Sequence, residues 1–234
     1  MENSVMFVSL GPGDPELITL KGLNFLQQAD IIFCPSTLTP SGKVSSRSKD
    51  ILLELGLEES RISLFSVPMD KNRSEAIISY KKISTKIEKR YKNGSRIAVA
   101  AEGDAGFYSS THYICDNLSV NNIPTKRIAG VPAFIACGAL ANIHTVKQEE
   151  ELYIIPGVIT QKDLEERILY GSSIVIMKPS QSEEAIKKVI SSMQYVTFHY
   201  FENVGIKDKE FYSSHKQNII ERKFPYFSLF IICK

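Results

Sequence analysis

Residues 5–29, VMFVSLGPGDPELITLKGLNFLQQA, run from a strand pattern through a tight loop into a helix pattern. The segment 5–10 is mostly apolar, and the two glycines and two prolines that follow are typical of a stiff turn. The apolar positions beyond the turn recur close to the helical period, at Leu17, Leu20, Leu23, Leu26 and Ala29. This order predicts the first strand and the first helix of an α/β fold.

The same alternation continues along the chain. In the first half, strand patterns lie at 31–34, 62–68, 96–101 and 125–129. Helix patterns lie at 48–55, 74–91 and 108–118, and residues 36–48, after Pro35, form a polar loop pattern. Strands that alternate with helices predict a parallel sheet for this half.

The second half is expected to form its own, mixed sheet. Its strand patterns are 152–156, 173–178, 196–201 and 226–233, and its helix patterns are 133–142, 160–169 and 182–193. A hairpin or turn is expected within 205–218. No Pro/Gly linker separates the halves, so we place the boundary near Gly130 and predict two α/β domains, 1–130 and 131–234.

The composition limits the classes of function that the chain can have. The 234 residues are 43% hydrophobic, enough to bury a core. The formal net charge is 28 − 26 = +2, and residues 1–117 carry 14 basic and 14 acidic side chains against 14 and 12 in residues 118–234. The sequence therefore shows no basic block, which disfavours nucleic acid as a partner.

The cysteines and histidines indicate neither disulfides nor a metal site. Cys34, Cys115, Cys137 and Cys233 lie far apart among apolar neighbours, and the four histidines are equally scattered. We expect reduced thiols, no protein-bound metal and a cytoplasmic location. The N-terminal residues lack a basic segment followed by a long apolar one, and no apolar run reaches 18 residues, so neither a signal peptide nor a membrane span is expected.

Three loops after strands are candidate ligand sites, because α/β sheets bind ligands at the carboxyl ends of their strands. The loop 10–17 lacks a dinucleotide fingerprint, since Glu16 stands where a third glycine is needed, and is either a ligand loop or a plain turn. In the loop 101–110, small residues surround Asp104 and precede Phe107 and Tyr108; close approach to a ligand and a helix-capping Asx turn are both open. The third loop, 129–134, leads into a helix of small residues. Small residues allow either close approach of a ligand or tight packing of the helix on the sheet, and both are open.

Several segments together resemble the tetrapyrrole methylase family. They are LGPGDPELITLKG, GDAGFYSS, GVPAFIACGALANI, LYIIPG, IVIMKP and FPYFSLFII, in the family's order and spacing and over essentially the whole chain. The opening segment and PYFSL are most similar to the branch that methylates C20 of precorrin-2 or cobalt-factor II in cobalamin synthesis.

The resemblance implies two α/β domains, an S-adenosylmethionine site in the cleft between them, and a homodimer. The positions that match the family's cofactor site are Pro12, Gly103, Asp104, Phe107, Pro132, Ala133, Met177, Tyr226 and Ser228. One departure matters: the family's Gly-Asp-Pro is Gly103-Asp104-Ala105 here, followed by Gly106. Loss of the proline frees the backbone, so we expect a more mobile loop, which puts cofactor affinity or activity in question.

The implied reaction is methyl transfer from a sulfonium to a nucleophilic meso carbon, in which alignment matters more than a strong base. Asp104 and Tyr108 are the candidate catalytic residues for removing the meso proton. His112 is a further candidate by position, and we interpret it as a partly buried helix histidine.

The substrate's carboxylates require local cations. Arg47 and Arg73 are the predicted contacts, with Lys43, Lys49 and Lys71 beside them, and solvated surface charge is the equal alternative for each. Any cobalt is expected to arrive inside the substrate. Two other functions stay open: a family member acting on another precorrin, uroporphyrinogen III, an rRNA nucleotide or a protein side chain, and a non-catalytic ligand-binding domain.

Overall fold

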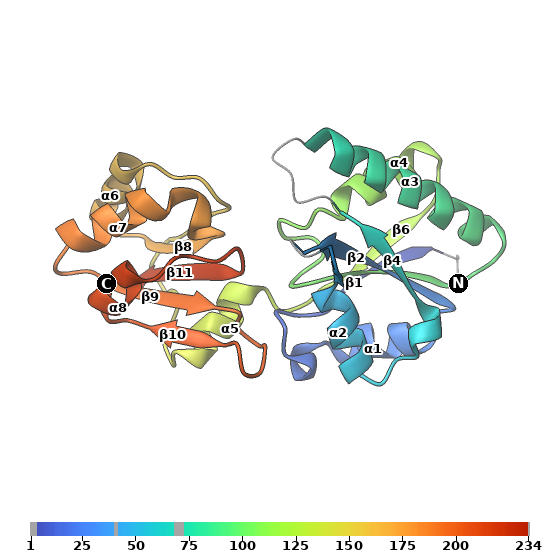
Figure 1. The fold of residues 1–234 in the computed structure, drawn as a ribbon, viewed down its shortest axis with the longest axis horizontal. Helices are drawn as coiled ribbons and strands as arrows, with labels where there is room; N and C mark the ends of the chain where they lie inside the picture. Colours follow the sequence, from blue (N-terminus) through green and yellow to red (C-terminus); the bar gives the residue numbers. More distant parts are fainter. Residues whose placement is uncertain (1–3, 40–41, 68–72, 234) are drawn as a thin grey trace. The chain divides into compact units, whose positions relative to one another are not determined.

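The computed structural model describes residues 4–39, 42–67 and 73–233, without the side chain of Arg73. The chain packs into two compact units, Met1–Pro132 and Ala133–Lys234, each with its own sheet (Figure 1). The predicted boundary at Gly130 lies two residues before this division.

The first unit is built on a parallel sheet, as predicted. Its strands follow the order β4 (Ile62–Ser66), β2 (Ile31–Leu38), β5 (Ile97–Ala101), β1 (Val5–Ser9) and β6 (Thr125–Ile128), and all these neighbours pair in parallel. A short strand, β3 (Val44–Ser45), runs antiparallel to the end of β2. Two single-turn helices, Pro15–Leu17 and Glu59–Arg61, lie in its connections.

Helices cover both faces of this sheet because its strands are apolar on both sides. Figure 1 shows α3 (Arg73–Lys92) and α4 (His112–Val120) on one face, and α1 (Leu20–Gln27) and α2 (Arg47–Glu54) on the other. Successive residues of β1 alternate between the two cores: Phe7 packs with α3 and α4, and Val8 packs with α1 and α2. The two cores fix where each strand ends and so where its loop begins.

Pro35 does not end the second strand, contrary to the sequence prediction. The strand continues through Pro35 to Leu38, and Pro35 lies opposite Phe65 of β4. The backbone carbonyl of Ser36 accepts from Val67, so Ser36 faces β4 and Pro35 faces the opposite side, where pairing with β5 stops at Phe33. A missing N–H costs nothing there, because no strand requires it.

The second unit contains the predicted mixed sheet. Its order is β10 (Phe211–Ser213), β9 (Thr197–Glu202), β11 (Ser228–Cys233), β8 (Ser173–Met177) and β7 (Leu152–Ile155). Only β7 and β8 pair in parallel. Residues 205–218, predicted to form a hairpin or turn, supply β10 and the start of α8 (Lys216–Glu221).

The helices of the second unit pack on this sheet. Figure 1 shows α6 (Gln161–Tyr170) and α7 (Glu183–Ser192) over one face, where they share a core with β8, β9 and β11. The helix α5 (Ala133–Leu140) packs against β11. Its Gly138 is tightly packed, because an added Cβ would lie 2.5 Å from the Thr145 hydroxyl. In the part of the chain that the structure describes, no helix is both long and apolar enough to cross a membrane.

Candidate active site

The first two predicted loops are joined by backbone hydrogen bonds. The Gly11 N–H donates to the Gly103 carbonyl at 3.2 Å, and the Gly103 N–H donates to the Gly11 carbonyl at 2.6 Å. Both glycines have positive φ, +79° and +66°, which most other residues adopt at a cost. The loops after β1 and β5 thus form one small backbone ledge at the carboxyl edge of the sheet.

Ser9 joins strand β6 to this ledge. Its buried hydroxyl donates to the Ile128 carbonyl at the end of β6, at 2.6 Å, and accepts the Ala105 N–H at 2.8 Å. A serine at the end of a buried strand therefore links the ends of β1, β5 and β6. Sequence reasoning missed Ser9, although a polar residue closing an apolar strand was a visible signal.

Asp104 fixes the same loops through both carboxylate oxygens. Oδ1 accepts the Gly106 N–H at 2.8 Å, which is the Asx turn considered from the sequence, and Oδ2 accepts the Gly130 N–H at 2.8 Å. These charge-assisted bonds are strong and directional. The contacts favour a positioning role for Asp104, and its role as a base stays a prediction.

Gly130 and Gly103 have opposite surroundings. A Cβ added to Gly130 would lie 2.4 Å from Ser9 Cβ, so the third loop approaches β1 as closely as the backbone permits. A Cβ added to Gly103 would meet nothing within 4 Å. The open space at Gly103 lets a ligand approach this backbone closely, although the Gly103 N–H and carbonyl already bond to Gly11.

Ala105 has a bonded N–H that proline would lack. It is the buried donor to Ser9, and the neighbouring Gly106 N–H is held by Asp104. The side chains of Ser9 and Asp104 thus restrain the backbone where the proline ring would otherwise do so. These two hydrogen bonds oppose the greater loop mobility that we expected from the Ala105-Gly106 departure.

Tyr108 occupies an unusual backbone conformation at the tip of the second loop. Its φ is +49°, its side chain is 51% exposed, and its ring packs edge-on against Phe107 with 4.7 Å between centroids. Non-glycine residues in the left-handed region are uncommon and gather at functional sites. His112 begins α4 and is exposed, not partly buried as expected, and its Nδ1 lies 3.1 Å from the Ser109 carbonyl oxygen.

Arg47, predicted as a substrate contact, reaches the residue just after β5. Its Nε lies 3.5 Å from Oε2 of Glu102, and the two side chains are 15% and 29% exposed. Burial raises the pKa of the Glu102 carboxyl and the Arg47 charge opposes this rise; burial also lowers the pKa of Arg47. Arg47 is therefore already balanced by a carboxylate beside Gly103.

The other predicted cations have different surroundings. Lys43 is exposed, and Lys49 forms an ion pair with Glu59. Lys71 and the side chain of Arg73 lie outside the described residues. Pro12 is buried in the first loop, and Pro132 ends the first unit, directly before α5 and its first residue Ala133.

Three predicted residues of the second unit lie together at one end of its sheet. Met177 ends β8 and pairs with Leu229, next to Ser228, the first residue of β11. The Ser228 carbonyl accepts the N–H of Lys178 at 3.3 Å. Tyr226, 40% exposed, lies two residues earlier and packs edge-on against Phe227.

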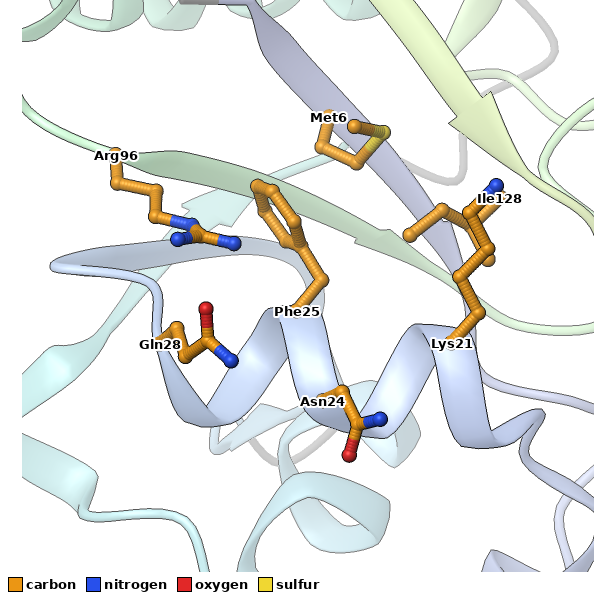
Figure 2. Close-up of a pocket in the computed structure, with 7 residues that line it drawn as sticks. All are labelled: Met6, Lys21, Asn24, Phe25, Gln28, Arg96 and Ile128. Carbon is orange, nitrogen blue, oxygen red and sulfur yellow. The ribbon is translucent and has the colours of Figure 1, made fainter. Parts of the chain in front are cut away.

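A separate pocket of about 390 Å³ lies beside α1 in the first unit. Figure 2 shows Lys21 and Phe25 of α1, and Gln28 directly after it, directed toward Met6, Arg96 and Ile128, whereas Asn24 of α1 points away from them. The Arg96 guanidinium lies 4.6 Å from the Phe25 ring centroid. None of these seven residues belongs to the predicted site, and among the residues that the structure describes no cluster of three or more potential metal ligands occurs.

The model of the Tetrapyrrole (Corrin/Porphyrin) Methylases matches residues 4–218. The chain belongs to this family. Two curated relatives are a precorrin-2 C(20)-methyltransferase of a Sinorhizobium species, 28% identical over 79% of this chain and 77% of its own, and a probable cobalt-precorrin-2 C(20)-methyltransferase of Methanocaldococcus jannaschii, 30% identical over 81% and 78%.

Solved methyltransferase structures share the fold. A cobalt-precorrin-4 methyltransferase aligns with a TM-score of 0.69 at 16% identity, covering 98% of this chain and 94% of its own. A uroporphyrin-III C-methyltransferase from Thermus thermophilus, solved with S-adenosylhomocysteine, aligns with a TM-score of 0.66 at 14% identity, covering 99% and 97%. The two-domain α/β architecture predicted from the sequence is confirmed.

Four residues of this tetrapyrrole methylase shape the candidate site but were absent from the predicted set. They are Ser9, Glu102, Gly130 and Lys178. Three lie beside a predicted position in the sequence or in the same loop, but their roles depend on partners 26 to 119 residues away. Lys178 carried no local signal beyond its place after Met177.

Proposed function

We propose that this tetrapyrrole methylase is an S-adenosylmethionine-dependent C-methyltransferase that adds a methyl group to C20 of precorrin-2 or cobalt-factor II in cobalamin synthesis. The observation that carries the proposal is the match, over about four fifths of the chain, to two relatives named for this position. One of the two names specifies a cobalt-containing substrate, so the proposal covers both forms.

The loops of the first unit fit the cofactor. Gly11, Gly103 and Gly130 bring the backbones of three loops together, and Gly103 leaves its surface open. Such a ledge lets a flat ligand approach the backbone closely, and a carbonyl oxygen that already accepts one hydrogen bond can accept a second from a polar ligand. When bound, S-adenosylmethionine supplies a methyl group on a positively charged sulfur. Pro12, Phe107, Pro132, Ala133, Met177, Tyr226 and Ser228 remain the proposed additional contacts.

The work of the protein is then alignment. Holding a nucleophilic carbon in line with a methyl donor is worth up to about 7–11 kcal/mol. Ser9 and Asp104 serve this purpose by fixing the ledge through four hydrogen bonds to backbone groups. Because both Asp104 oxygens hold backbone N–H groups, Tyr108 is the better placed of the two proposed catalytic residues to meet the substrate.

Substrate recognition rests on local cations. The net charge of +2 gives no strong general attraction for a polycarboxylate. Arg47 and Arg73 remain the proposed substrate contacts, and the homodimer and the cytoplasmic location remain part of the proposal.

Two measurements test the function in order. Calorimetry with S-adenosylhomocysteine should show binding at micromolar concentration, and absence of binding would refute the enzyme proposal. Incubation with labelled S-adenosylmethionine and precorrin-2 or cobalt-factor II should then add one methyl, whose position is mapped by NMR. A methyl group at another carbon assigns a different branch of the family, and binding without transfer to either substrate favours another acceptor or a binding role.

A further inference from the structure

Lys178 has a backbone conformation that its sequence does not favour. It follows the last residue of β8, precedes Pro179, and has φ +55° and ψ +51°. A lysine before proline ordinarily takes an extended backbone, and the left-handed region is disfavoured for residues with a Cβ. Glycine or asparagine would make the same turn with less strain, so the lysine side chain itself needs an explanation.

The strained turn places the Lys178 amine on an aromatic ring of the predicted cofactor edge. Nζ lies 5.7 Å from the centroid of Tyr226, within the range of a cation–π contact. The backbone is fixed as well, because the Lys178 N–H donates to the carbonyl of Ser228. Lys178 thus stands among Met177, Tyr226 and Ser228, three residues predicted to contact the cofactor.

The positive charge of Lys178 is not balanced by an acidic side chain. Within residues 4–39, 42–67 and 73–233, the ion pairs use other lysines and arginines, and no carboxylate pairs with this amine. The side chain is only partly exposed. A partly exposed lysine whose amine lies near a ring and pairs with no carboxylate can bind one more partner, and a carboxylate is the partner that ammonium groups bind most strongly.

We propose that Lys178 is a ligand-binding residue that pairs with a carboxylate of a bound reactant. The inference rests on the proposed methyltransferase function, in which two reactants carry such a group. One is the amino-acid part of S-adenosylmethionine and the other is a carboxylate side chain of the tetrapyrrole. Tyr226 holds the amine in place by its ring face.

Four variants test the charge. Lys178→Met removes it, Lys178→Arg keeps it, and Lys178→Gly removes it while relieving the backbone strain. Lys188→Met, an exposed lysine of α7 in the same unit, is the matched control. The unfolding midpoint of Lys178→Gly should equal or exceed that of the wild type, so any loss of binding in this variant is not caused by misfolding.

Calorimetry with S-adenosylhomocysteine and with 5′-methylthioadenosine, which lacks the amino-acid part, shows whether the carboxylate belongs to the cofactor or to the tetrapyrrole. If Lys178 holds the cofactor carboxylate, Lys178→Met and Lys178→Gly weaken S-adenosylhomocysteine binding about tenfold or more and leave 5′-methylthioadenosine unchanged. If Lys178 holds the substrate, both adenosyl ligands bind normally and KM for cobalt-factor II rises by a similar factor. In either case Lys178→Arg keeps a cation that can bind both the carboxylate and the Tyr226 ring, and its constants should stay within about threefold of wild type.

Three outcomes overturn the proposal. The first is that the Lys178→Met variant loses the same factor of affinity for S-adenosylhomocysteine and for 5′-methylthioadenosine. The second is that Lys178→Arg loses as much ligand affinity as Lys178→Met. The third is that no dissociation constant or KM changes by more than it does in Lys188→Met. Wild-type protein that binds no adenosyl ligand refutes the proposed function instead, so the two failures are distinguishable.

Discussion

The Oδ2 atom of Asp104 accepts the backbone N–H of Gly130 at 2.8 Å, across 26 residues of sequence. This bond closes the loop after β5 onto the loop after β6, while Oδ1 closes the former loop on itself. The carboxylate that first suggests a base by its type is therefore the residue that holds two loops together.

Replacing Asp104 with Asn should disturb one of these loops more than the other. A single amide oxygen serves one N–H, and the amide NH₂ then faces the second N–H. We expect a loss of about 1–3 kcal/mol in the free energy of unfolding and weaker S-adenosylhomocysteine binding. Urea unfolding and calorimetry measure both, with the exposed Asp116→Asn of α4 as control. Lower kcat with unchanged stability and cofactor affinity would point to a base instead.

Replacing Gly130 with Ala should destabilise the first unit because the new Cβ meets Ser9 Cβ at 2.4 Å. Overpacking of this kind costs about 1–3 kcal/mol. Adding Ser9→Gly removes the atom that is struck, so the double variant should lose less stability than the sum of the two single variants. A double-mutant cycle by urea unfolding measures the coupling, and strict additivity would contradict the close approach.

Replacing Arg47 with Met should destabilise the protein in a pH-dependent way. Burial raises the pKa of Glu102 from its ordinary 4.5, and Arg47 opposes the rise, so the variant raises it further. The folded state then holds a proton that the unfolded state has released, and stability falls as pH rises above 4.5 toward the raised value.

The loss in Arg47→Met should accordingly be about 1–3 kcal/mol near neutral pH and smaller at acid pH. Unfolding in urea across this range gives the difference. The double variant with Glu102→Gln removes the buried charge and should restore most of the stability at neutral pH. A pH-independent loss would show that Arg47 acts through packing alone.

His199 should make the second unit sensitive to acid. It is buried in β9, its Nδ1 lies 2.9 Å from the Tyr212 hydroxyl, and burial lowers its pKa below the ordinary 6.5. The unfolded state therefore takes up the proton first, and stability is lost as pH falls below 6.5 toward the depressed value. His199→Gln should flatten this part of the stability profile, while the exposed His215→Gln should leave it unchanged. Parallel profiles for His199→Gln and wild type would contradict the assignment.

Strand and helix order followed from local patterns, because apolar spacing reports which face of an element is buried. Pro35 shows the limit of such patterns. Proline is a good strand breaker when its N–H would be needed, and only the pairing of β2 shows that this N–H faces a side without a partner. His112 shows the same limit for burial, because its exposure depends on how α4 lies on the sheet.

The sequence by itself determined the family, the two α/β halves and the loops that follow the strands, since motif order and hydrophobic period are local properties of the chain. Only the tertiary structure decided what the residues in those loops do. Ser9 meets Ile128, Asp104 meets Gly130, and Arg47 meets Glu102, over separations that no local pattern encodes. Hydrogen bonds and ion pairs act over a few ångströms of space, so the contacts of these side chains depend on the pairing of the strands.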